Sequence, residues 1–141
     1  LIDALTDLKH YQQLITMPNS DTMGLHIREG LTAYAENRSN VFCVESFGSL
    51  GYLSCMKHCQ LMLGNTSSGF IEAAYFSKPV VNIGCRQRGR IETTNIVTIP
   101  IKKADIINAV KKAEEMKLTS NFKIYGDGSA AERIIDILKQ I

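Results

Sequence analysis

The chain of 141 residues is long enough for one domain with a hydrophobic core and too short for two ordinary domains. Hydrophobic residues make up 45% of it and charged residues 21%, which is the balance of a globular protein rather than of a disordered or collagen-like one. The formal net charge of +2 is spread along the sequence and no apolar run reaches the roughly 20 residues of a membrane span, so we expect a cytoplasmic domain without nucleic-acid or membrane partners.

The first part of the chain alternates between helical and strand-like patterns. Apolar residues at helical spacing predict helices, and short apolar runs bounded by turn residues predict strands. The expected elements are, in order, the end of a helix over residues 1–8, a strand over 11–17, an amphipathic helix over 23–37, a strand over 41–44 and a helix over 50–59.

The second part continues the same alternation. Pro79 precedes a β-branched run at the first position of a strand, where proline is tolerated. Ser129 and Glu132 have the spacing of a capping box at the start of the last helix. The expected elements are a strand over residues 60–64, a helix over 70–76, strands over 80–83 and 96–99, a helix over 104–116 and a final helix from 129 onward.

Short strands thus alternate with helices along the whole chain. This alternation implies parallel strands that are joined by right-handed crossovers, with helices on both faces of the sheet. The predicted fold class is therefore α/β, a Rossmann-like doubly wound parallel sheet in a single domain over residues 1–141. Ligands of such sheets bind at the carboxyl ends of the strands, so the loops after each strand are the places to search for a site.

The loop Gly64–Gly69 follows a predicted strand and leads into a helix. Glycines and small hydroxyl side chains let backbone N–H groups approach an anion, and the helix adds a partial positive charge. The segment is neither a Walker A loop nor a GxGxxG fingerprint, and a plain serine N-cap and turn would give the same pattern. Glu72 could accept hydrogen bonds from a diol such as a ribose, or simply favour the helix dipole.

A second loop, Gly84–Arg90, follows the predicted strand over 80–83. It places Arg86, Arg88 and Arg90 within five residues, and guanidinium groups bind phosphate in a bidentate manner. A solvated basic loop is the alternative. Two such loops after successive strands favour anion binding, because both lie at the same edge of a parallel sheet.

The remaining polar residues give weaker signals. Asn19 and Asp21, in a turn after the first strand, either bond to local backbone or line a ligand site. The four cysteines contain no CxxC pair, so we expect neither a zinc site nor disulfides, but free thiols that are buried or half-buried. The histidines lack metal-binding spacing and receive no metal or catalytic role: His10, His26 and His58.

Together these motifs resemble the C-terminal half of hydrolysing UDP-N-acetylglucosamine 2-epimerases, in the same order and spacing along nearly the whole chain. The most specific part is GNTSSGFIEA over residues 64–73 followed by NIGCRQRGR over 82–90, which is more similar to the hydrolysing, sialic-acid-type branch than to the non-hydrolysing one. The other matching segments are Pro18–Asp21, Phe47-Gly48 with Tyr52-Leu53, Pro79–Gly84, Asn95 and Tyr125–Gly128.

The resemblance implies a GT-B architecture, in which two Rossmann-like domains face a cleft and the C-terminal one binds UDP. This chain would be that C-terminal domain, its partner would be an N-terminal domain that the chain lacks, and the full enzyme would be a homo-oligomer without cofactor or metal. The residues implied to bind the UDP-sugar are Thr66, Ser67, Ser68 and Gly69 at the diphosphate, Glu72 at the ribose, Arg86 and Arg90 at the nucleotide, Phe47 and Gly48 near the uracil, and Asn19 and Asp21 along the cleft.

The implied reaction is elimination of UDP from UDP-N-acetylglucosamine, followed by addition of water to give N-acetylmannosamine. Elimination needs a base for the C2 proton and stabilisation of the leaving diphosphate. The family's acid–base residues lie upstream of this chain, so no catalytic residue is assigned here and the chain alone is expected to be inactive. Two alternatives stay open: the donor-binding half of a GT-B glycosyltransferase, against which the Arg-Gln-x-Gly-Arg segment argues, and a non-catalytic nucleotide-binding module. The sequence does not distinguish a sugar with one acetamido group from one with two.

Overall fold

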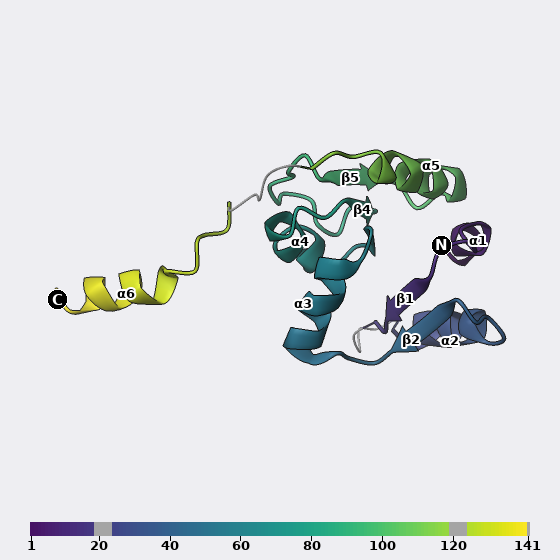
Figure 1. Cartoon of the computed structure of the whole chain (residues 1–141), viewed down its shortest axis with the longest axis horizontal. Helices are drawn as coiled ribbons and strands as arrows, with labels where there is room; N and C mark the ends of the chain where they lie inside the picture. Colours follow the sequence, from purple (N-terminus) through teal and green to yellow (C-terminus); the bar gives the residue numbers. More distant parts are fainter. Residues whose placement is uncertain (19–23, 119–123, 141) are drawn as a thin grey trace.

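The computed structural model describes residues 1–18, 24–118 and 124–140, in which helices and strands alternate (Figure 1). The helices are α1 (Ile2–Asp7), α2 (Gly24–Ala35), α3 (Gly48–His58), α4 (Glu72–Tyr75), α5 (Lys103–Glu114) and α6 (Ala130–Leu138), with a 3-10 turn η1 (Ser67–Gly69). The strands are β1 (Gln13–Thr16), β2 (Val41–Val44), β3 (Met62–Gly64), β4 (Val80–Ile83) and β5 (Ile96–Ile99). Each predicted strand is present within its predicted range.

All strand pairs of the described residues are parallel, as the alternation predicted. β1 pairs with β2, and β3, β4 and β5 form a second sheet with β4 in the middle. Gly64 at the end of β3 lies opposite Asn82 near the end of β4, so the two strands finish at the same edge. The loops that follow β3 and β4 therefore start side by side.

One face of the sheets is covered by α1, α2 and α5. Leu8, just after α1, packs against Val81 of β4 and against α5 residues Ala109, Val110 and Ala113. Leu5 of α1 packs against Val41 of β2, and Leu63 of β3 joins the same cluster. The helix α1 thus connects the two sheets through one apolar core.

The opposite face of the second sheet is covered by α3 and α4. Met56 of α3, Ala73 of α4 and Val80 of β4 form a buried cluster there. All four residues of β4 are buried, and each large apolar side chain that is removed from water contributes about 1.5–3 kcal/mol. A Cβ atom on Gly69 would lie 3.0 Å from Val80 Cγ1, so the turn η1 rests directly on this strand.

The fully buried side chain of Asn95 connects the starts of β4 and β5. Its Nδ2 donates to the carbonyl of Lys78 at 2.8 Å, and its Oδ1 accepts a hydrogen bond from Thr93 Oγ1. The backbone N–H of Val80 donates to the Asn95 carbonyl at 2.8 Å. Asn95 belongs to the segments that resemble the epimerases. Its hydrogen bonds join the residues before β4 to the residues before β5, which is a structural role.

The helix predicted over residues 70–76 is shorter in the structure. Within this range only α4 (Glu72–Tyr75) is α-helical, and the 3-10 turn η1 precedes it. Ser77 has a φ of 51°, in the left-handed region, and Pro79 follows two residues later. A left-handed residue followed by proline is a common way to end a helix, which explains why α4 ends at Tyr75, whereas the shortening at its start reflects the 3-10 turn η1 that precedes it.

The capping box predicted at the start of α6 is wrong. The Ser129 side chain makes no capping hydrogen bond. Instead, the Ser129 N–H donates to Asp127 Oδ1 at 3.0 Å, and Arg133 pairs with Asp127 Oδ2 at 2.5 Å. These two interactions, the backbone hydrogen bond first, lower the pKa of Asp127. A carboxylate two residues before Ser129 therefore takes the role that Glu132 was expected to play.

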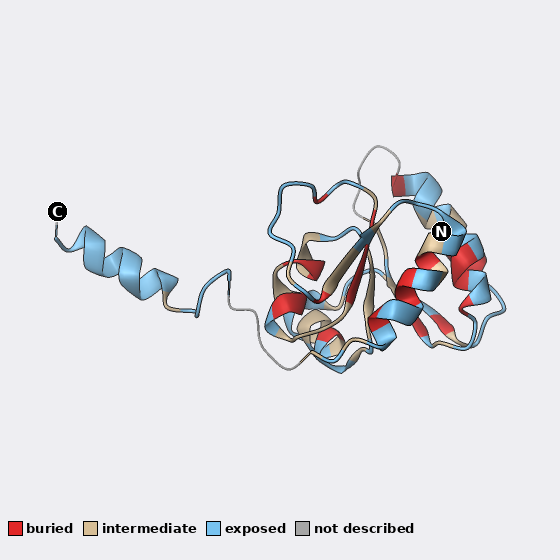
Figure 2. Ribbon diagram, turned by 90° about the horizontal axis from the view of Figure 1, so that it is seen from above, coloured by how far each residue is buried: buried red, intermediate tan, exposed pale blue. Residues whose placement is uncertain are grey.

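The helix α6 lies apart from the rest of the molecule (Figure 1), and all its residues are exposed (Figure 2). Its exposed apolar residues are Ile134, Ile135, Ile137 and Leu138. Across the three described segments, no helix combines the length and the apolar character that crossing a membrane would require.

Candidate functional site

Two loops extend from neighbouring strand ends, and we name them by their side chains. The hydroxyl loop, residues 65–69, follows β3, and the arginine loop, residues 84–90, follows β4. Gly84 and Gly89 have φ values of 82° and 91°, which L-residues with a side chain rarely adopt. Glycine at these positions lets the arginine loop turn back over the sheet edge.

The hydroxyl loop is built around a Thr cap. The Thr66 Oγ1 accepts a long hydrogen bond of 3.4 Å from the Ser68 N–H and caps η1. Thr66 is exposed, Ser67 and Ser68 are half-buried, and Gly69 is buried against the sheet. Because η1 and α4 are each about one turn long, a helix macrodipole adds less positive charge here than the sequence suggested. Anion binding at this loop therefore depends on individual N–H and hydroxyl groups.

The arginine loop consists of consecutive tight turns. The Arg88 N–H donates to the Cys85 carbonyl at 3.0 Å, and the Arg90 N–H donates to the Gln87 carbonyl at 3.2 Å. Arg86, Arg88 and Arg90 are exposed, whereas Gln87 is only 7% exposed. The loop therefore turns its arginines to the surface and its glutamine inward.

The two loops converge on one hollow of about 450 Å³, as their positions after successive strands predicted. Its lining residues are Thr66, Ser67, Arg86, Gln87, Arg88 and Arg90. Gln87 Nε2 donates to the Asn65 carbonyl at 2.8 Å and so connects one loop to the other. Three guanidinium groups and two hydroxyls, with no carboxylate among the lining residues, make a surface suited to a phosphate or diphosphate.

Glu72, the first residue of α4, lies just beyond the hydroxyl loop and does not line the hollow. Its Oε2 atom is buried and has no hydrogen-bond partner among the described residues. A buried carboxylate oxygen is expensive to leave without a donor, typically by about 1–3 kcal/mol or more. Glu72 therefore has the chemistry of an acceptor for hydroxyl donors.

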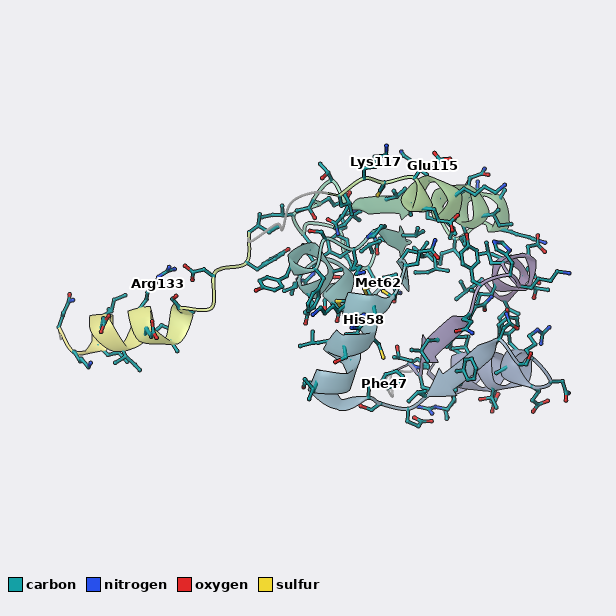
Figure 3. All side chains as sticks on the ribbon, viewed as in Figure 1. Phe47, His58, Met62, Glu115, Lys117 and Arg133 are labelled. Atoms are coloured by element: carbon teal, nitrogen blue, oxygen red, sulfur yellow. The ribbon has the colours of Figure 1, made fainter. Side chains whose placement is uncertain are left out.

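Several predicted site residues lie outside the hollow lining. Ser68 and Gly69 belong to the hydroxyl loop but are not among the lining residues. Phe47 and Gly48 form the start of α3, where Gly48 has a φ of 61°. Figure 3 shows Phe47 at the opposite end of α3 from His58. Phe47 and Gly48 are not among the residues that line the hollow, so their predicted place near the uracil stays a prediction.

The remaining predicted residues, Asn19 and Asp21, lie outside the described residues. Pro18 directly before them is described, and its carbonyl accepts a hydrogen bond of 3.4 Å from Arg28 Nη2. Arg28 also pairs with Glu45, just after β2. This arginine therefore links the carboxyl ends of β1 and β2.

Sequence reasoning missed Gln87 and gave Arg88 no individual role. A glutamine between two arginines is typical of a solvated loop, and its hydrogen bond to a residue 22 positions away leaves no signal in its own segment. The cysteine prediction was partly wrong, because Cys85 in this loop is exposed while the other three thiols are half-buried. The described residues hold no group of three or more His, Cys, Asp or Glu side chains placed for a metal ion.

Comparison with known proteins gives one family. The family described as UDP-N-acetylglucosamine 2-epimerase matches residues 1–139. Two curated relatives are a GDP/UDP-N,N'-diacetylbacillosamine 2-epimerase (hydrolyzing) of Campylobacter jejuni, 38% identical over 122 residues, and a UDP-N,N'-diacetylbacillosamine 2-epimerase (hydrolyzing) of Legionella pneumophila, 35% identical over 124 residues. These matches cover 86% and 88% of this chain but 31% and 33% of the relatives, so the chain spans about a third of their length.

More distant proteins agree with the fold. A UDP-N-acetylglucosamine 2-epimerase of Neisseria meningitidis is 29% identical over 103 residues, which cover 72% of this chain and 27% of that protein. Two solved structures of UDP-GlcNAc 2-epimerase from Methanocaldococcus jannaschii, one in complex with UDP-GlcNAc and UDP, match with TM-scores of 0.71 and 0.78 at 19% and 18% identity. Each match covers 99% of this chain and 40% of the other, which confirms the predicted Rossmann-like α/β fold.

Proposed function

The chain belongs to the UDP-N-acetylglucosamine 2-epimerase family, and we propose that it is the UDP-binding part of a hydrolysing UDP-sugar 2-epimerase. The observation that carries the proposal is the hollow between the hydroxyl and arginine loops, which has three arginines and two hydroxyls at the carboxyl ends of adjacent parallel strands. Open α/β sheets bind their ligands at this edge. The hollow is proposed to hold the diphosphate of UDP.

We propose that residues outside the hollow bind the rest of the nucleotide. The unpartnered Oε2 of Glu72 is proposed to accept the ribose hydroxyls, since a vicinal diol supplies the donors that this buried oxygen lacks. Phe47 and Gly48 are proposed to approach the uracil, and Asn19 and Asp21 to face the sugar side of the cleft. These four assignments rest on the family resemblance alone.

The proposed chemical role is stabilisation of the leaving group. When UDP leaves the anomeric carbon, negative charge develops on the diphosphate, and preorganised guanidinium and hydroxyl donors lower the energy of that state. The proton at C2 requires a base that the hollow does not supply, because its lining contains no carboxylate or histidine. We propose that the proton is transferred by residues outside the hollow, in the part of the relatives' length that this chain does not span, and we expect the chain alone to form no product.

The proposed substrate class is a UDP-linked 2-acetamido sugar. Relatives named for N-acetylglucosamine and for N,N'-diacetylbacillosamine share this class and differ in a second acetamido group. Incubation of a full-length protein that contains this chain with each UDP-sugar, followed by NMR of the products, decides between them. Release of UDP without inversion at C2 from either sugar would contradict the epimerase assignment.

The binding proposal is tested on the 141-residue chain by calorimetry with UDP and with uridine. We expect UDP to bind more tightly than uridine, because only UDP carries the diphosphate. Glu72→Gln and Arg90→Met each remove a charge-assisted interaction, and we expect each to weaken UDP binding by about 1.5–3 kcal/mol. Arg133→Met, the same change on the distant helix α6, is the matched control and leaves affinity unchanged (Figure 3). Equal affinities for UDP and uridine, or unchanged UDP binding in both site variants, would remove the site assignment.

A further inference from the structure

Gln87 is the only residue of the hollow lining that is buried. It lies between two exposed arginines, Arg86 and Arg88, so its burial is not shared by its neighbours in sequence. Polar side chains are rarely buried unless they make hydrogen bonds. The hydrogen bond that accounts for this burial is the one to the Asn65 carbonyl, at 2.8 Å.

This hydrogen bond fixes the orientation of a peptide plane in the hydroxyl loop. The peptide group is planar and trans, so the C=O of Asn65 and the N–H of Thr66 point in opposite directions. An amide donor that holds the Asn65 carbonyl therefore also fixes the direction of the Thr66 N–H. Thr66 is the residue that caps η1, so its placement is passed on to Ser67.

Gln87 fixes the arginine loop through its backbone as well. The Gln87 carbonyl accepts the N–H of Arg90 and closes the turn that contains Gly89. One residue thus holds the turn that carries Arg90 and, through its side chain, the loop that carries Thr66 and Ser67. Two loops 22 residues apart are held together at this point.

We infer that Gln87 is a positioning residue that presets the distance between the arginine and hydroxyl loops for a diphosphate. The inference rests on the proposed function. Loops that are already held in the binding arrangement lose less conformational entropy when the ligand binds, and this preorganisation raises affinity. The effect is expected on the phosphates, because the hydrogen bonds of Gln87 go to Asn65 and Arg90, in the two loops that line the hollow.

The test compares the UDP and uridine affinities of the Gln87→Met variant. Methionine keeps the length and volume of glutamine but cannot donate to the Asn65 carbonyl. We expect a loss of roughly three- to tenfold in UDP affinity, in line with one neutral hydrogen bond, and unchanged uridine affinity. If the methionine variant does not fold, Gln87→Asn takes its place. Asparagine keeps the amide but is one methylene shorter, so we expect the same selective loss of UDP affinity.

Gln13→Met is the matched control for a purely structural effect. Gln13 is also a buried glutamine whose Nε2 donates to backbone carbonyls, those of Leu5 and Leu8, at the start of β1. We expect this variant to have a lower unfolding temperature and the same ratio of UDP affinity to uridine affinity as wild type. An unchanged ratio in the Gln87 variants, with normal discrimination by wild type, overturns this inference alone. Failure of wild type to prefer UDP over uridine overturns the proposed function, and this inference with it.

Discussion

Replacing Asn95 by alanine tests whether this residue fastens the sheet or serves the ligand. Asn95 is fully buried, and its side chain joins the segment before β4 to the segment before β5. The substitution removes a donor to the Lys78 carbonyl and an acceptor for the Thr93 hydroxyl. It leaves the backbone hydrogen bond from Val80 in place.

The magnitude follows from those two hydrogen bonds. Each contributes about 0.5–1.5 kcal/mol, and a buried polar group left without its partner costs about 1–3 kcal/mol. The Lys78 carbonyl cannot follow the shortened side chain because the adjacent β4 is held on both edges, by β3 and β5. We therefore expect Asn95→Ala to lower the free energy of unfolding by about 2–4 kcal/mol.

The assay is urea unfolding followed by circular dichroism, with calorimetry of UDP binding below the transition. UDP affinity is expected to remain within about twofold of wild type, since Asn95 lies at the amino ends of the strands and the hollow at their carboxyl ends. Asn108→Ala, an asparagine-to-alanine change on the exposed face of α5, is the control and leaves stability nearly unchanged or slightly raised. A loss below about 1 kcal/mol in Asn95→Ala, or a large loss of UDP affinity in the folded variant, would refute the reasoning.

Three further outcomes are expected. Gly69→Ala places a methyl group 3.0 Å from Val80 Cγ1, so we expect a denaturant titration to show a free energy of unfolding lower by about 1–3 kcal/mol. The shift of the hydroxyl loop should also weaken UDP binding. A variant as stable as wild type would show that the turn η1 does not pack on β4. Cys85, the exposed thiol, should react first with a maleimide as followed by mass spectrometry, and UDP should slow that reaction because the loop is then occupied. Asp127 has a lowered pKa, so the stability that it gives to the start of α6 is present above its ordinary pKa and is lost as the pH falls through the lowered value; Arg133→Met should raise that pKa toward its ordinary value in an NMR titration, and an unchanged pKa would contradict the pairing.

The strands and their parallel direction were predictable because the signals are local. Three of the four residues of Val80–Ile83 are β-branched, Pro79 and Gly84 bound the run, and it forms β4 with those limits. The loops after β3 and β4 could be placed at one sheet edge by topology alone. Their convergence followed from the parallel order of the strands.

The wrong or missed predictions concern residues whose hydrogen-bond partners are set by a competing neighbour or by a distant segment of the chain. Ser129 has a capping-box sequence, but Asp127 is closer and accepts its N–H first. Gln87 is buried by Asn65, a residue far away in sequence, so no periodicity in its own segment reveals its role. The division of the strands into two hydrogen-bonded sheets likewise depends on pairings between distant segments, to which the local pattern is insensitive.

The central claim is that the hydroxyl and arginine loops together hold the diphosphate of a nucleotide. A crystal structure of this chain with UDP tests it most directly. We predict diphosphate density in the hollow, with its oxygens within hydrogen-bond distance of Ser67 or Thr66 and of at least one arginine from the loop that follows β4. Density for UDP elsewhere on the molecule, or contacts to only one of the two loops, would contradict the account.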